Sequence, residues 1–225
     1  MIGNLEVTKC AHISRRKFDT IFDCFSEDIP ALKTANIAHV NRNTANRYYG
    51  LFRALIYTSA IEERKSVSLG NGIEIDESYF GPHRVRGKRG RGAGGKVIVF
   101  GLLKRKDRVY TEIVNSAEQK ELMPIIRKVV KSGSDIYTDG WKSYNALAIY
   151  GYNHKKVIHE ENEFSKGDGT HINGVESFWS WTKRRLNKFN GVNKRQFKQY
   201  LLESEWRFNH RNILRKDLRN MLRKS

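Results

Sequence analysis

The spacing of apolar residues divides the chain into a helical first part and a mixed second part. In the stretch SRRKFDTIFDCF, residues 14–25, the side chains Phe18, Ile21, Phe22 and Phe25 recur at intervals of three and four. This spacing places them on one face of a helix. We therefore expect an amphipathic helix here, and helical patterning continues through the first sixty or so residues.

Two more helices are predicted before the pattern changes. Pro30 permits a helix start before ALKTANIAHV, and Asn43 is a suitable N-cap for a longer helix over residues 44–64. A short helix, a tight turn and a longer helix rich in Asn, Arg and Tyr are typical of a helix-turn-helix, whose second helix enters the major groove. The residues expected to reach DNA from this helix are Arg42, Thr44, Asn46 and Arg47. A helical hairpin that makes no DNA contact is the alternative.

A strand is predicted shortly after residue 70, where SLGNG forms a turn-rich joint. In the following stretch GIEIDESYFG, Ile73 and Ile75 would lie on one face of the strand. Glu74 and Asp76 would lie on the other face, because side chains alternate along a strand. The hydrophobic period therefore changes from helical to extended at this joint.

The rest of the chain mixes both periods. The expected elements are strands at 96–106, 108–114, 135–139 and 154–159, helices at 117–132 (broken or kinked at Pro124), 141–151 and about 194–210, and a helix within 171–186. This order predicts an α/β (α+β) fold in which a mixed sheet is flanked by helices. We expect a helical DNA-binding domain at 1–66 and a second domain at 67–225, which includes the C-terminal helix.

Charge indicates what the protein binds. The 225 residues contain 42 Lys and Arg against 24 Asp and Glu, a net charge of +18. Such a surplus favours a polyanion, and nucleic acid is the usual one. A ribosomal or nucleoid packaging protein that needs only its charge is the simplest alternative, so the positions of the acidic residues must decide the question.

The expected phosphate contacts lie in two basic segments. Residues 82–96 form a Gly/Arg/Lys loop without acids, which we expect to be a basic flap. A second cluster follows Glu176 on the predicted helix. The phosphate-contacting residues proposed from these segments are Arg84, Arg86, Lys88, Arg89, Arg91, Lys183, Arg184 and Arg185.

The sequence also predicts where the protein resides. No run of 18 apolar residues is present, and the N-terminal stretch lacks the apolar core of a secretory signal. We expect a cytoplasmic protein that associates with the nucleoid through DNA and has no membrane partner. The two cysteines form no CxxC pair, which argues against a zinc ribbon.

Three carboxylates stand out by position. Asp76 lies inside a predicted strand, Asp139 ends another, and Glu176 lies in the first turns of a helix. Charged residues are costly in central strands unless they are paired. Two strand acids and a helical acid can converge above a sheet, and oxygen-only ligands select a hard ion such as Mg²⁺. Lys183 follows Glu176 by seven residues, which places it two turns further on the same helix face.

Other acids compete for this site. Glu74 shares the predicted face of Asp76, Glu77 is adjacent to it, and Asp135 is in register with Asp139 in a regular strand. Periodicity alone does not choose among them.

Three segments resemble the motifs of a known family, and this resemblance chooses among the competing acids. The stretches IEIDESYFG, YTDGWKSY and HINGVESFWSWTKRRL resemble, in this order, the three motifs of the DDE-type transposases of bacterial insertion sequences, in the ISXO-like branch. The resemblance covers roughly residues 70–210. It implies a ribonuclease-H-like catalytic domain with two Mg²⁺ or Mn²⁺ ions.

Residue roles follow from the same resemblance. It implies that Asp76, Asp139 and Glu176 are the catalytic metal ligands and that Lys183 is an accessory DNA contact. Some relatives carry asparagine in the third motif, so Asn173 is an alternative ligand. We rank Glu176 first because an anionic oxygen offsets the charge of a metal ion better.

The implied function is that of an insertion-sequence transposase. Such a protein binds the terminal inverted repeats of double-stranded DNA, cleaves strands and joins them to target DNA, as a homo-oligomer on paired ends. Two alternatives remain open: a ribonuclease-H-like nuclease or resolvase that uses the same acids without joining strands, and a catalytically inert helix-turn-helix DNA-binding protein.

Overall fold

The protein divides into two compact units. The computed structural model describes residues 13–81, 96–139, 147–157 and 172–224. One unit, here called the helical unit, combines the chain up to Glu63 with the chain from Leu186 onward. The other, here called the sheet unit, spans Arg64–Arg185. Each unit is described by itself below.

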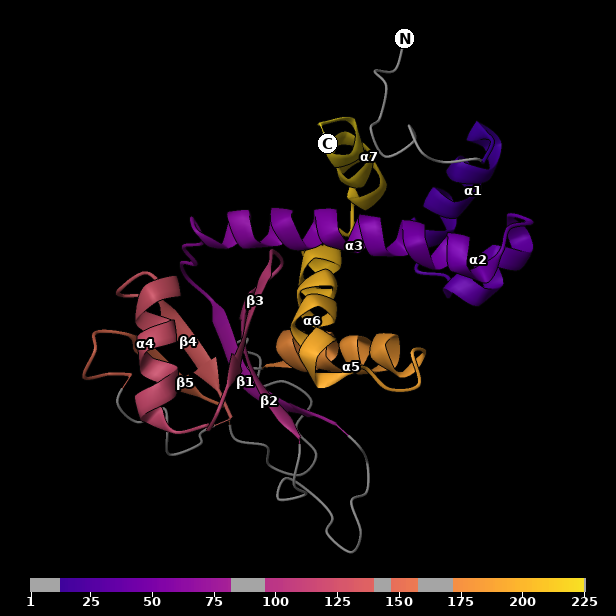
Figure 1. Cartoon of the computed structure of the whole chain (residues 1–225). Coiled ribbons are helices and arrows are strands. Elements are labelled where there is room, and N and C mark those ends of the chain that lie inside the picture. The colour runs from indigo at the N-terminus through magenta and orange to yellow at the C-terminus, as the bar shows by residue number, and fades with distance from the viewer. Residues whose placement is uncertain (1–12, 82–95, 140–146, 158–171, 225) are drawn as a thin grey trace, which may run out of the picture. The chain divides into compact units, whose positions relative to one another are not determined.

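Five helices build most of the helical unit. They are α1 (Arg15–Ser26), α2 (Ala31–Ile37), α3 (Arg42–Arg64), α6 (Lys194–Asn209) and α7 (Leu214–Lys224). The single long helix α3 is the most extended of them in Figure 1, and its last residue already belongs to the sheet unit. The apolar face expected for residues 14–25 is buried, since Phe18, Ile21, Phe22 and Phe25 are at most 5% exposed. The three predicted N-terminal helices are confirmed.

The start of α3 differs from the prediction. The Asn41 side-chain oxygen accepts a hydrogen bond from the backbone N–H of Asn43 at 2.8 Å, and α3 begins at Arg42. The first turn of a helix has amide groups without intrahelical partners, and Asn41 satisfies one of them. Asn41 is therefore the N-cap, and the predicted cap Asn43 lies inside the helix.

The C-terminal segment also differs from the prediction. We assigned residues 186–225 to the second domain, but the structure places them in the helical unit. The physical reason is a shared core, because Trp206 of α6 and Leu218 of α7 are buried together with Phe22 and Phe52. Sequence reasoning did not identify α7, which carries Leu214, Leu218 and Leu222 at intervals of four.

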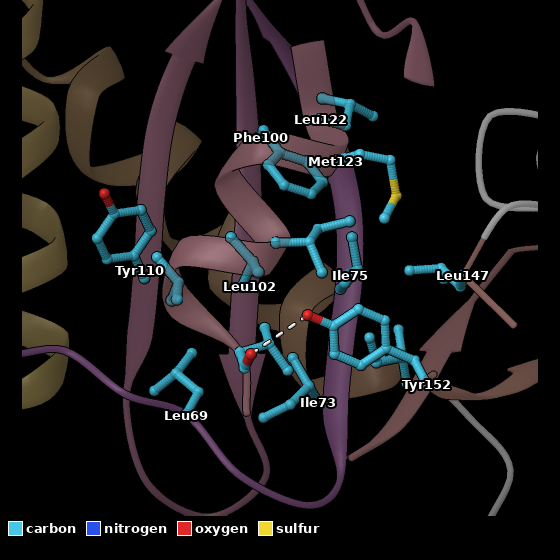
Figure 2. Close-up of a cluster of buried hydrophobic side chains, with 14 of the residues drawn as sticks. Leu69, Ile73, Ile75, Phe100, Leu102, Tyr110, Leu122, Met123, Leu147 and Tyr152 are labelled. Carbon is cyan, nitrogen blue, oxygen red and sulfur yellow. Dashed lines mark hydrogen bonds between the residues drawn. The ribbon is translucent and has the colours of Figure 1, made fainter. Parts of the chain in front are cut away.

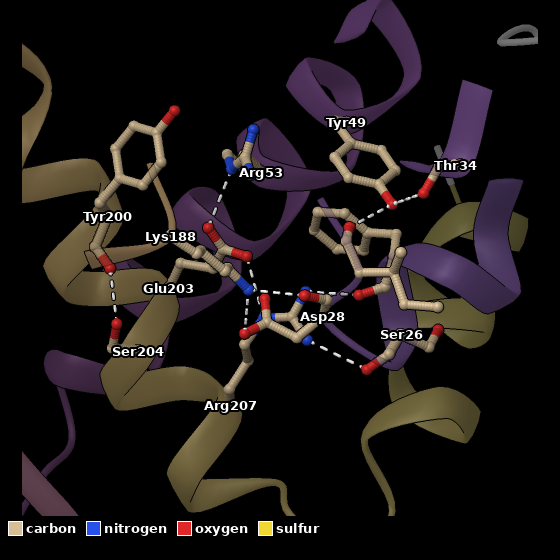
Figure 3. A network of polar contacts seen from close by, with 12 residues as sticks. Ser26, Asp28, Thr34, Tyr49, Arg53, Lys188, Tyr200, Glu203, Ser204 and Arg207 are labelled. Carbon is tan, nitrogen blue, oxygen red and sulfur yellow. Dashed lines mark hydrogen bonds and ion pairs between the residues drawn. The ribbon is translucent and has the colours of Figure 1, made fainter. Parts of the chain in front are cut away.

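A buried ionic network holds part of this unit together (Figure 3). The Glu203 carboxylate, 1% exposed, accepts hydrogen bonds from Arg53 Nε and Arg207 Nε, each at 2.9 Å. Arg207 also donates to the backbone oxygens of Phe25 at 2.8 Å and Ser26 at 3.1 Å. Glu203 of α6 thus joins α3 to the end of α1 through two arginines.

The same network fixes the turn between α1 and α2. Asp28 adopts a left-handed conformation with φ of 59°, and it forms an ion pair with Lys188. The Tyr49 hydroxyl of α3 donates to the Ile29 backbone oxygen at 2.7 Å and hydrogen-bonds to Thr34 at 2.6 Å. Side chains from α2, α3 and the segment after α5 therefore constrain one short turn.

The sheet unit contains a five-stranded mixed sheet. Its strands are β1 (Ile73–Phe80), β2 (Val97–Lys104), β3 (Val109–Val114), β4 (Asp135–Thr138) and β5 (Asn153–Lys156). They lie in the order β3-β2-β1-β4-β5. The pairs β1–β2 and β2–β3 are antiparallel, and β1–β4 and β4–β5 are parallel. The predicted α/β (α+β) class, with a mixed sheet flanked by helices, is confirmed.

Within the described part of the sheet unit, α4 (Gln119–Val129) and α5 (Asn173–Asn187) accompany this sheet. One face of the sheet packs against α4, where Ile75 and Phe100 gather with Leu122 and Met123 in a buried cluster (Figure 2). Helix α4 continues through Pro124, so the helix is not broken there, which was one of the two expectations for this residue. The alternate residues of β1 are left for the opposite face.

Some predictions fall outside the described residues. The basic flap with Arg84, Arg86, Lys88, Arg89 and Arg91 lies there, as do residues 141–146 of the helix predicted at 141–151. Residues 147–150 of that predicted helix form a turn. None of the described helices combines the length and apolar character that a membrane-spanning segment requires.

We expect the substitution Glu203→Ala to destabilise the protein by about 3–5 kcal/mol, because it leaves the buried Arg207 and the mostly buried Arg53 without their shared carboxylate. Urea unfolding followed by circular dichroism measures this loss. The matched control is Glu118→Ala, which removes an exposed ion pair with Lys120 and should cost less than about 1 kcal/mol. Equal losses in both variants would contradict a stabilising role of the buried network.

Candidate active site

One predicted acid lies on a strand, and another directly follows the neighbouring parallel strand. In the β1–β4 pair, Ile73 is opposite Ile136 and Glu74 is opposite Tyr137. Continuing this register by two residues brings Asp76 level with Asp139, the residue directly after β4. The parallel pairing therefore places both aspartates at the same height of the sheet.

The electrostatics of Asp76 bring in the third acid. Burial, together with the negative charges of Glu77, Asp139 and Glu176, raises the pKa of Asp76 to about 7. A hydrogen bond from the Glu77 backbone N–H opposes this shift in pKa. Like charges raise the pKa of a carboxyl group only when they are near it. The structure thus brings the three predicted acids into one electrostatic cluster within the sheet unit.

Helix α5 packs tightly on the sheet next to Asp76. Gly101 of β2 is the register partner of Asp76, and a Cβ atom at Gly101 would lie 2.3 Å from Trp179 Cζ2. The Trp179 ring also meets Phe80 edge to face at 6.0 Å. Only glycine at position 101 allows the indole to approach β2 this closely.

The apolar stripe expected on α5 is confirmed. Its members are buried, with exposed fractions of 8% or less: Ile172, Val175, Trp179 and Leu186. On the remaining surface of the helix, Glu176 and Lys183 are exposed. The stripe therefore orients the helix so that Glu176 and Lys183 reach solvent.

Lys183 lies beside the acid cluster. Its ammonium group lies 5.7 Å from the centre of the Phe80 ring. Desolvation lowers the pKa of Lys183, as does the charge of Lys96, whereas the negative charge of Asp76 raises it. Lys183 and Asp76 are therefore electrostatic neighbours. Sequence reasoning did not identify Lys96, which lies at the end of the predicted flap.

Glu74, a competing acid, has a different environment from Asp76. It is 1% exposed, and its carboxylate accepts hydrogen bonds from Arg105 Nε and the backbone N–H of Val175, each at 2.9 Å. Asp135, the rival of Asp139, forms an ion pair with Lys155 at 3.4 Å. Both rivals have structural partners in the sheet unit.

The other residues predicted on α5 differ in exposure. Asn173 is the exposed first residue of the helix, and Arg184 is exposed. Arg185 is only 5% exposed, because it lies on the side of the helix that packs inward with Thr182. The structure therefore does not present Arg185 as a phosphate contact, in contrast to the prediction.

The candidate DNA-reading residues lie at the start of α3 in the helical unit. Arg42, Asn46 and Arg47 are exposed, and Thr44 is half-buried. The fully buried Ala45 lies between them and anchors this turn of the helix. The structure thus presents the N-terminal turns of α3 to solvent.

The donor set of the acid cluster suits a hard cation. Three carboxylates supply only oxygen ligands. The pKa of Asp76 is raised first by burial and then by neighbouring negative charge, and a divalent ion would offset that charge. Within the described residues, no three His, Cys, Asp or Glu side chains are arranged to hold a metal ion. The cluster therefore matches Mg²⁺ in its chemistry, but the side chains do not form a closed set of ligands.

Comparison with known proteins identifies the family. The model of the ISXO2-like transposase domain matches residues 68–209, more than half of the chain. The chain belongs to this family. The matched range contains Asp76, Asp139 and Glu176 and ends at the last residue of α6.

One similar protein and several solved structures have names that refer to transposases or transposition. An uncharacterized transposase-like protein of Haemophilus influenzae is 42% identical over 108 residues, which cover 48% of this chain and 86% of that protein. Among solved structures, the Mos1 strand transfer complex is 10% identical with a TM-score of 0.32, covering 96% of this chain and 80% of that chain. A pre-cleavage Mos1 transpososome is 11% identical with a TM-score of 0.29, covering 99% and 83%. These TM-scores are too low to support a conclusion about fold or function.

For this family member, stability should fall as the pH rises through the titration of Asp76. The pKa of Asp76 is about 7 in the folded protein and 3.8 ordinarily. Between these values the folded state holds a proton that the unfolded chain has released, so the stabilising contribution is complete below about pH 4 and lost as pH rises through about 7. Thermal unfolding in EDTA from pH 4 to 8 measures the slope.

The variant Asp76→Asn should flatten this slope and be more stable than the wild type at pH 8, by on the order of 2 kcal/mol. Asp107→Asn, at an exposed aspartate between β2 and β3, should keep the wild-type slope. A wild-type slope in Asp76→Asn would show that the pKa of Asp76 is not raised in the folded protein.

Proposed function

We propose that this protein is the transposase of an insertion sequence, which binds the terminal inverted repeats and catalyses metal-dependent DNA strand cleavage and strand transfer. The observation that carries the proposal is the convergence of three acids. The β1–β4 register brings Asp76 level with Asp139, and Glu176 is close enough for its charge to help raise the pKa of Asp76. Three acids from β1, the end of β4 and α5 form one cluster, in a chain of the ISXO2-like transposase family.

The three acids are proposed as the metal ligands, and Mg²⁺ or Mn²⁺ is the proposed cofactor, as two ions. Bound ions would supply Lewis-acid stabilisation of the attacking and leaving oxygens of a phosphodiester. Asp76 is proposed as the ligand shared by the ions, since the charges of the other two acids both act on it. Glu176 is preferred over Asn173 as the third ligand because its charge contributes to the cluster.

Lys183 is proposed to hold the phosphate backbone at this cluster. Its ammonium is partly desolvated beside Phe80 and close to Asp76. A desolvated cation interacts more strongly with a phosphate than a fully hydrated one. Lys96 has the same charge and lies near Lys183, so it joins Lys183 as a proposed contact.

End recognition is proposed for the first turns of α3. Arg42, Thr44, Asn46 and Arg47 would face the major groove, with Asn and Arg providing the side chains that read base edges. The net charge of +18 supports general attraction to double-stranded DNA. The buried network around Glu203 would keep the α1–α2 turn and α3 in a fixed arrangement for this contact.

Two further parts of the proposal follow from the family. Joining two transposon ends requires a homo-oligomer on paired DNA, which we propose for the active state. A ribonuclease-H-like nuclease or resolvase would use the same acids, so only a strand-transfer assay separates it from a transposase. Cleavage without any joined product would favour the nuclease.

Alanine at Asp76, Asp139 or Glu176 should abolish strand cleavage, a loss of about 10³-fold or more, because each removes a ligand of the reacting centre. Cleavage of a labelled terminal-repeat duplex with Mg²⁺ measures this loss, and a gel-shift assay on the same duplex should show unchanged binding. Asn173→Ala is the matched control and should retain cleavage. Normal cleavage by Asp139→Ala would remove the acid cluster from the mechanism.

End binding should depend on α3. Arg47→Ala should weaken binding to the terminal repeat by about 1–3 kcal/mol and lower the salt dependence of binding. Gel-shift titrations at several salt concentrations measure both effects. Arg16→Ala removes an exposed arginine of α1 and serves as the control for charge alone. An equal loss in both variants would argue for nonspecific attraction rather than a helix-turn-helix contact.

A further inference from the structure

A second acid on the functional face of β1 contacts the helix that carries Glu176. Glu74 precedes Asp76 by two residues, so both side chains leave the strand on the same side. The two differ in accessibility, because Glu74 is 1% exposed and Asp76 is half-buried. A carboxylate this deeply buried is stable only when its oxygens are well paired.

The two carboxylate oxygens of Glu74 accept hydrogen bonds from different parts of the sheet unit. One carboxylate oxygen, Oε2, accepts the backbone N–H of Val175 at 2.9 Å. The other, Oε1, accepts Arg105 Nε at 2.9 Å. The Arg105 guanidinium in turn stacks over the Tyr137 ring of β4, with 3.7 Å from its central carbon to the ring centre. Glu74 is thereby held between β4 and the N-terminus of α5.

The contact with α5 has the character of a helix cap supplied by a distant strand. Val175 is the third residue of α5, and its N–H is one of the amides that lack an intrahelical partner. The N-terminal end of a helix carries partial positive charge, which favours a carboxylate there. Glu74 thus fixes the first turn of α5 directly to β1.

Gly174 makes this approach possible. A Cβ atom at position 174 would lie 2.7 Å from Glu74 Oε2 and 3.1 Å from Leu103 Cδ2. Both neighbours are parts of buried side chains, and Arg105 holds the carboxylate in place. An alanine at this position would therefore displace the helix end or break its bond to Glu74.

The consequence concerns Glu176, which follows Val175 directly. The hydrogen bond from Val175 to Glu74 lies one residue before the proposed ligand on α5. Asp76 lies two residues after Glu74 on β1. A single carboxylate therefore sets the spacing between the start of α5 and the strand that carries Asp76.

We propose that Glu74 is a positioning residue, which holds the first turn of α5 against β1 so that Glu176 stands at the cation-binding cluster. This inference rests on the proposed function, since it assumes that Asp76 and Glu176 bind a cation. Glu74 does not touch substrate in this role, because it is buried and both of its oxygens have protein partners. It acts only through the position of Glu176.

The test is Mn²⁺ binding by the full chain without DNA, measured by electron paramagnetic resonance of free Mn²⁺. Glu74→Ala should weaken Mn²⁺ binding by about tenfold or more, the usual effect of removing a partner behind a metal ligand. The Mn²⁺ affinity of Glu74→Gln should stay within about threefold of that of the wild type. The glutamine amide oxygen still accepts a hydrogen bond from the Val175 N–H, while Arg105 turns to solvent. Gly174→Ala should weaken binding as Glu74→Ala does, although it retains the carboxylate.

A matched control separates positioning from stability. Glu112 of β3 also pairs with an arginine, Arg64 at 2.6 Å, and accepts the Tyr110 hydroxyl at 2.9 Å. Glu112→Ala should lower the melting temperature without changing the affinity for Mn²⁺. Hydrogen exchange in the first turn of α5 should rise in Glu74→Ala and Gly174→Ala and stay at the wild-type level in Glu112→Ala.

The outcomes distinguish this inference from the function on which it rests. If the wild-type chain binds no Mn²⁺, the proposed cation site is overturned. The same holds if Asp76→Asn binds Mn²⁺ as tightly as the wild type does. Mn²⁺ binding by the wild type that is unchanged in Glu74→Ala would overturn the positioning role alone. If Glu74→Ala does not fold, Gly174→Ala decides the question, and wild-type affinity in that variant would equally overturn the positioning role.

Discussion

The pairing of β1 along both of its edges is the constraint on which the sheet unit depends. Antiparallel β2 lies on one side of it and parallel β4 on the other. Because side chains alternate along a strand, this pairing commits Ile73 and Ile75 to the core beneath α4 and turns Glu74 and Asp76 toward α5. A shift of one residue would exchange the two sets and bury the acids in the apolar core.

Helix α5 converts this arrangement of the strand into a site. The close contact of Trp179 with Gly101 fixes the middle of the helix, and the bond from Val175 to Glu74 fixes its start. Glu176 and Lys183 lie on the same helix, so the apolar and backbone contacts decide where these charged groups stand. The acid cluster is thus a consequence of packing as much as of residue identity.

Much of this arrangement could be predicted from the sequence because it follows local periodicity. The alternation around Ile75 and the stripe that includes Trp179 both predicted the observed burial, and the mixed sheet followed from the order of elements. Tertiary contacts decided the rest. Glu74 and Asp76 have the same charge and the same strand face, and only contacts with residues far along the chain separate them. Likewise, nothing local shows that Arg185 is buried, and the roles of the three acids remain predictions.

The shared core of the helical unit has a consequence for synthesis. Its first helices leave the ribosome early, but Phe22 and Phe52 are covered in part by Trp206, Leu218 and Leu222. The sheet unit is inserted between these segments, so it can emerge completely while the early helices still lack their partners. The core around the segment proposed to recognise DNA is therefore complete only after α6 and α7 have been made.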